Sequence, residues 1–131
     1  YKQAFRRQRQ GNTPNIQTGP LTTKINEISK QFDPKGQIGI NLDAAFKKIS
    51  NAKGDLQKLH LAKIEIDQTI STLGENSVGN TTKRFLTNVV KDLKAELDLQ
   101  SPSYKAASAE FARLSPEVQK ISDSVIGRIA S

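Results

Sequence analysis

The residues that could perform chemistry are few in this chain and poorly placed to act together. The single histidine, His60, lies between two leucines, and no cysteine or second histidine is present to complete a metal site. Glu65 and Asp67 stand two positions apart, so within a helix they point to different sides. The same holds for Glu96 and Asp98. No serine has a suitable base, and we therefore predict a protein that is not an enzyme and holds no metal or cofactor.

One glycine spacing is shared with nucleotide-binding loops. Gly74 and Gly79 are separated as in a P-loop, in which a lysine directly after the second glycine reaches the outer phosphates. Here Asn80 and Thr81 occupy the positions of that lysine and of the hydroxyl residue behind it. A predicted helix, rather than a strand, precedes the loop. We interpret 74–80 as a plain connection between two helices.

The first ten residues are the most strongly charged segment. The formal net charge of the chain is +7, and this segment contributes four positive charges without any acid: Lys2, Arg6, Arg7 and Arg9. These side chains could pair with nucleic-acid phosphates, while Tyr1 and Phe5 could stack on bases or enter an apolar groove. The glutamine-rich spacing also permits docking to another protein, and a solvated terminus is the plain alternative. Because a turn-rich stretch follows, we expect residues 1–20 to be an irregular basic arm and linker.

The rest of the chain has the periodicity of helices. Apolar residues recur every three or four positions, as in helices that bury one face. Turn residues divide this pattern into the segments 21–32, 42–53, 55–73, 81–99, 102–114 and 116–129. Asn41 and Asp55 are expected to cap the second and third segments, and Gly54 is expected to end the second. The predicted fold class is all-α, with helical hairpins or an extended helical bundle of about five to six helices.

Two Ser-Pro steps mark the starts of the last two helices. In Ser101-Pro102 and Ser115-Pro116, the serine oxygen can accept from first-turn amides and the proline suits the first helical position. The apolar residues that follow each Ser-Pro step form a narrow stripe along one side of the predicted helix. Such a narrow stripe is buried well only by packing against another helix. The predicted packing or interface positions on these helices are Tyr104, Phe111, Leu114, Val118 and Ile121.

Composition excludes several classes of protein. The chain has no cysteine, and therefore no disulfide framework or thiolate nucleophile. Its apolar runs are far shorter than the roughly 20 residues needed to cross a bilayer, and the N-terminus lacks the apolar stretch of a secretory signal. It also has no methionine. We expect residues 21–131 to be a helical module within a longer parent chain.

A motif near the C-terminus reads Leu97-Asp98-x-x-Ser101-Pro102-x-Tyr104-x-x-Ala107, with Phe111-Ala112 and Ser115-Pro116 behind it. It resembles a recurring helical segment of internal virion proteins from tailed bacteriophages and prophages, over residues 42–131. This chain departs from that segment after Phe111-Ala112. In the phage proteins a proline or glycine often follows the aromatic-Ala pair sooner, whereas here Arg113 and Leu114 come first. The resemblance implies a long, helical, oligomeric parent that is packed with the genome and released through the tail. A lytic domain elsewhere in the parent is compatible with it.

The sequence thus supports two hypotheses from different classes. The first is a non-enzymatic assembly module of a phage virion-internal or DNA-ejection protein. It would pack through its helices with other copies of itself or with other virion proteins, in the virion or otherwise in the cytoplasm. The alternative is a basic helical nucleic-acid-binding protein that contacts DNA nonspecifically through its N-terminal arm. Binding of the second kind weakens steeply with salt.

Overall fold

The computed structural model describes residues 1–11 and 14–113 of the chain, and the secondary structure of this part is helical without β-strands. Its helices are α1 (Lys2–Arg9), α2 (Gly19–Ser29), α3 (Gln37–Asn51), α4 (Leu56–Thr72), α5 (Ser77–Gln100) and α6 (Pro102–Arg113). The prediction of an all-α fold with five to six helices is confirmed.

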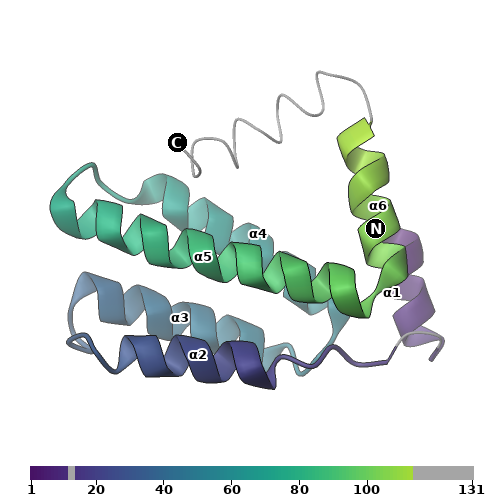
Figure 1. Cartoon of the computed structure of the whole chain (residues 1–131), viewed down its shortest axis with the longest axis horizontal. Helices are drawn as coiled ribbons and strands as arrows, with labels where there is room; N and C mark the ends of the chain where they lie inside the picture. The colour runs from purple at the N-terminus through teal and green to yellow at the C-terminus, as the bar shows by residue number, and fades with distance from the viewer. Residues whose placement is uncertain (12–13, 114–131) are drawn as a thin grey trace.

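Helices α2 to α5 form the body of the molecule. They lie side by side along its long axis in Figure 1, where α3 packs against α2, α4 and α5, and α4 packs against α5. Helices α1 and α6 lie together at one end of this body and run steeply across its axis. Because α1 contacts both α6 and α4, the N-terminal segment meets the last described helix.

The predicted apolar stripes meet in one hydrophobic core. Leu42 and Ile49 of α3, Leu59 of α4 and Leu93 of α5 are each at most 1% exposed. Burying one such side chain contributes about 1.5 to 3 kcal/mol. Within the described residues, most residues of the apolar stripes are therefore buried by other helices of the same chain and need no partner chain to cover them.

Two predicted helix starts are confirmed by their capping hydrogen bonds. An Asp55 carboxylate oxygen accepts from the backbone N–H of Lys58 at 2.9 Å, and α4 begins at the next residue after Asp55. The hydroxyl oxygen of Ser101 accepts from the backbone N–H of Tyr104 at 3.2 Å, with Pro102 opening α6. These side chains satisfy amides that the first helical turn leaves without partners.

The predicted cap at Asn41 is wrong. Helix α3 begins at Gln37, and Asn41 lies inside it, where its side chain donates to the Gln37 carbonyl at 2.7 Å. The reason is the close approach of the preceding turn. A Cβ atom on Gly39 would collide with the backbone carbonyl of Asp33, so this glycine lets the turn pack directly on the first turn of α3.

The prediction of an irregular N-terminal arm is wrong for residues 2–9, which form α1. Ala4 and Phe5 are buried in the same core as the longer helices. The Gln8 side chain then fixes the helix, since its amide N–H donates to the Gly54 carbonyl at 2.8 Å and its oxygen accepts from the backbone N–H of Leu56. The N-terminal segment is therefore a packed element.

Ile16, which precedes α2, also belongs to the core, so the core extends across the predicted boundary at residue 20. Ile16 is 3% exposed, and its backbone N–H donates to the Gly54 carbonyl at 2.9 Å. Gly54 has a φ of +80°, and a Cβ atom there would lie 2.9 Å from the Ile16 carbonyl oxygen. Only glycine accommodates both the backbone conformation and the close approach.

Candidate functional site

An aromatic cluster joins α1, α4 and α6. Its members are Tyr1, Phe5, His60, Tyr104 and Phe111. The ring of Tyr1 is central, with its centroid 4.4 Å from that of His60 and 5.2 Å from that of Tyr104. Such pairs contribute about 0.5 to 1.5 kcal/mol beyond their buried area. The cluster therefore holds the two end helices against α4.

A hydrogen bond links the two polar members of the aromatic cluster. The Tyr104 hydroxyl lies 2.7 Å from Nδ1 of His60, and Tyr104 is only 1% exposed. Burial raises the pKa of Tyr104, so the phenol stays protonated. It shares this hydrogen bond with the imidazole, whose tautomer decides which of the two groups donates. Burial, and then the charge of Lys63, lower the pKa of His60 to about 4. At neutral pH both groups are uncharged and satisfy each other, which makes the bond structural.

A second group of polar side chains lies along α4 and α5. Asp67 is 4% exposed, and its Oδ1 atom has no hydrogen-bond partner in the described part of the chain. Burial raises the pKa of Asp67 in spite of the nearby Lys63, and burial lowers the pKa of Lys63. On α5, Lys94 pairs with Asp98 at 2.7 Å. Burial therefore opposes the ionisation of both Asp67 and Lys63.

The burial of Asp67 leads to a prediction on stability. A carboxyl with a raised pKa in the folded state stabilises the fold below its unfolded pKa of 3.8, and this contribution is lost as the pH rises through the folded value. Asp67→Asn mimics the neutral form at every pH. In urea unfolding, we expect the variant to gain stability relative to wild type between pH 4 and pH 7.

Asp43→Asn is the matched control for this change. Asp43 is exposed and forms only an i,i+4 pair with Lys47, so its variant should show little of this pH-dependent gain. A loss of stability for Asp67→Asn that grows toward pH 7 would show instead that attraction by Lys63 outweighs burial.

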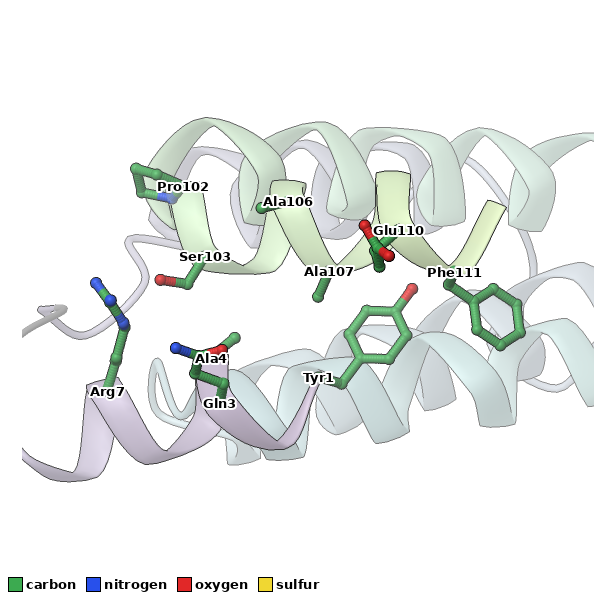
Figure 2. A pocket seen from close by; sticks show the side chains of 10 residues that line it. All are labelled: Tyr1, Gln3, Ala4, Arg7, Pro102, Ser103, Ala106, Ala107, Glu110 and Phe111. Atoms are coloured by element: carbon green, nitrogen blue, oxygen red, sulfur yellow. The ribbon is translucent and has the colours of Figure 1, made fainter. Parts of the chain in front are cut away.

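A hollow of about 620 Å³ is lined by residues of α1 and α6, beside the place where the two helices are in contact. In Figure 2, Ala107 of α6 points toward α1, and Ala106, next to it on α6, also lines the hollow. Arg7 lies toward one end of the hollow, and the rings of Tyr1 and Phe111 lie toward the other. The volume is that of a ligand site, but the lining carries no nucleophile with a base and no converging carboxylates. The hollow is suited to packing rather than to catalysis.

The predicted docking residues divide into two groups. Lys2, Arg6, Arg7 and Arg9 are all exposed on α1. Phe5 is 9% exposed and lies in the aromatic cluster, so the prediction that it is available to stack on bases is wrong. A second hollow, of about 460 Å³, lies on the exposed side of α1 and is lined by Gln3, Arg6, Arg7 and Gln10.

The predicted packing positions are only partly described. Tyr104 packs inside the chain, and the half-buried Phe111 lies against Tyr1 with ring centroids 6.1 Å apart. Leu114, Val118, Ile121 and the Ser115-Pro116 step lie outside the described residues.

The connection between α4 and α5 joins two helices, but it is shorter than the predicted 74–80, because α5 begins at Ser77 rather than at Thr81. The side-chain oxygen of Asn76 accepts from the backbone N–H of Gly79 at 2.7 Å and caps α5, which begins at Ser77. A Cβ atom on Gly79 would collide with the Gly74 carbonyl. Gly79 therefore lets the loop pack closely on the first turn of α5, and its amide already has a partner in the Asn76 side chain.

Neither metal chemistry nor known relatives assign the chain a function. In the part covered by residues 1–11 and 14–113, no three His, Cys, Asp or Glu side chains gather as metal ligands. No described helix is long and apolar enough to cross a membrane. Compared with known proteins, the chain matches no family model, no curated protein and no solved structure. The α1–α6 hollow and the basic face of α1 remain as the surfaces from which function can be argued.

Proposed function

We propose that the chain is a non-enzymatic assembly module, and that the α1–α6 hollow receives a helix from a second copy of the chain. The observation that carries this proposal is the alanine lining. Ala106 is exposed and Ala107 half-buried, so at these two positions of α6 an incoming helix would meet only methyl groups. Packed helix axes lie about 8 to 10 Å apart, and small contact residues allow the closer distances.

We further propose that the parent chain is an internal virion or DNA-ejection protein of a tailed bacteriophage, with other virion proteins as additional partners. The support is the C-terminal motif, together with the structural roles of its described residues. Ser101 caps α6, and Tyr104 anchors α6 to α4 through His60. The motif is thus the corner between α5 and α6, as expected of a segment that serves architecture rather than catalysis.

Ala106→Arg tests the assembly surface. A long charged side chain in the hollow should weaken self-association by at least about tenfold, which is about 1.4 kcal/mol, without lowering the stability of the monomer. The measurement is sedimentation equilibrium of the 131-residue chain over a range of protein and salt concentrations. Because each copy carries a net charge of +7, added salt should strengthen self-association by screening the repulsion.

Ala44→Arg is the control, since Ala44 is exposed on α3 and lies outside the hollow. It adds the same charge and the same side chain. Equal self-association of the two variants, or a wild-type chain that stays monomeric at every concentration, would contradict the proposed role of the hollow. In assembled particles, cross-links from α1 or α6 to another copy would support it.

A further inference from the structure

We infer that the exposed face of α1 binds the phosphodiester backbone of duplex nucleic acid. Lys2, Arg6 and Arg9 follow one another at intervals of four and three residues, so they lie on one side of the helix. Arg7 is next to them and is also exposed. No acidic residue precedes Glu27 in the chain, so α1 contains no carboxylate of its own that competes for these charges.

The hollow on this face has the donors that a phosphate needs. It is lined by Gln3, Arg6, Arg7 and Gln10, which offer two guanidinium groups and two carboxamides and no carboxylate. Guanidinium groups form paired hydrogen bonds with phosphate oxygens. The α1–α6 hollow contains Glu110, which makes it the less suitable of the two for an anion.

The helix holds these donors in a fixed arrangement before any ligand arrives. The buried Phe5 and the two hydrogen bonds of Gln8 attach α1 to the body of the molecule. Arg9 is further restrained, because its Nη1 donates to the side-chain oxygen of Gln57 at 3.3 Å. Binding therefore costs less ordering entropy than it would for an irregular arm.

The extent of the charge favours a polymer over a single phosphate. At about 1.5 Å per residue, Lys2 and Arg9 are separated by about 10 Å along α1, which is more than one phosphate can span. The aromatic side chains that could read single-stranded bases are unavailable, since Tyr1 and Phe5 pack in the aromatic cluster. The face is thus suited to the duplex backbone, without base recognition.

The test is fluorescence anisotropy of a labelled 20-base-pair duplex with the full 131-residue chain. With three or four phosphate contacts, the slope of log K against log salt should be about −3 to −4. Arg6→Gln combined with Arg7→Gln should reduce this slope by about 2 and weaken binding about 10- to 100-fold at 50 mM salt. Both side chains are exposed, so helicity and the unfolding midpoint should not change.

The control is Lys30→Gln combined with Lys35→Gln, which removes the same charge from exposed positions around the turn between α2 and α3. It should retain affinity within about threefold, since it affects only the long-range field. Two duplexes of unrelated sequence should bind equally, and a single strand should bind no more tightly.

Three results would overturn the inference. The first is no duplex binding at 50 mM salt, and the second is an equal loss of affinity in the control and the α1 variant. The third is an equal, α1-dependent affinity for vesicles of anionic phospholipid, which would assign the face to phosphate headgroups at a membrane surface. Arg7 lines both hollows, so the self-association of the α1 variant is measured alongside its duplex affinity by sedimentation. Ala106→Arg leaves the four basic side chains of α1 unchanged and tests the α1–α6 hollow separately.

Discussion

Tyr104→Ala is expected to lower the free energy of unfolding by about 3 to 5 kcal/mol. Tyr104 is 1% exposed and touches the rings of both Tyr1 and His60, so its removal leaves a cavity where α1, α4 and α6 meet. The hydrogen bond to His60 is lost as well. A loss of this size is a large fraction of the roughly 5 to 15 kcal/mol that stabilises a typical domain.

Urea unfolding followed by circular dichroism measures this loss, and Tyr104→Phe is its control. The phenylalanine keeps the ring and removes only the hydroxyl, so it should cost about 1 kcal/mol. In Tyr104→Ala, the loosened α1 should also be cleaved faster by trypsin at Arg6, Arg7 and Arg9 under native conditions. If the two variants were equally stable, the aromatic cluster would not be what attaches the end helices.

The helices that sequence reasoning located well are those with a complete local signal. Asp55 precedes a long apolar stripe, and Ser101-Pro102 combines a capping side chain with a ring that suits the first turn. In such places the side-chain chemistry and the periodicity agree, so no distant contact is needed to decide. The stripes also predicted the buried faces, because a helix with one apolar side has only one way to cover it.

Sequence reasoning failed where a distant surface decides the local structure. Tyr1, Ala4 and Phe5 already have the spacing of a helical face, but the surrounding basic and glutamine residues suggested a solvated arm. That face is buried only because α4 and α6 return to cover it. Similarly, the start of α3 depends on the Asp33 carbonyl packing against Gly39, a contact that no local propensity contains.

The candidate site was harder to predict than the fold. His60 and Tyr104 are separated by 44 residues, and nothing near either one in the sequence indicates the other. The sequence showed only that His60 lacks the partners of a metal site, whereas the structure places it in the aromatic cluster with a hydrogen-bond partner. Asp67 follows the buried Ile66, which placed it next to the stripe, but only the packing of α5 shows that its carboxylate is buried. The role of an isolated polar residue therefore depends on the residues that tertiary packing brings next to it.

The basic side chains of α1 are the opposite case. Their charge and exposure agree with the sequence analysis, but the segment that carries them is a packed helix. Lys2, Arg6, Arg7 and Arg9 are exposed as predicted, but they lie on a packed helix rather than on a free arm. A packed helix presents charge in a fixed row, whereas a free arm would also present its aromatic rings. The structure therefore favours phosphate contact over base stacking, and salt dependence distinguishes this contact from self-association.

Lowering the pH from 7 to 4.5 is expected to remove about 2 to 3 kcal/mol of stability through His60 alone. The unfolded chain binds a proton at this histidine near pH 6.5, whereas the folded chain binds it only near its pKa of about 4. A group with a lowered folded pKa favours unfolding as the pH falls between these values, at about 1.4 kcal/mol per pH unit.

His60→Gln isolates this contribution, because glutamine does not titrate and its side-chain oxygen can still accept a hydrogen bond. Urea unfolding of both proteins at pH 7 and pH 4.5 gives the difference between their free energies of unfolding at each pH. The carboxylates titrate in both proteins, so their contribution to this difference largely cancels. Wild type should lose about 2 to 3 kcal/mol relative to the variant over this interval. Asp67 acts in the opposite direction, since its raised pKa favours the fold as the pH falls, and this effect is common to both proteins. If the stability difference between wild type and His60→Gln were the same at both pH values, His60 would be solvated. The aromatic cluster would then not exclude water from the junction of α1, α4 and α6.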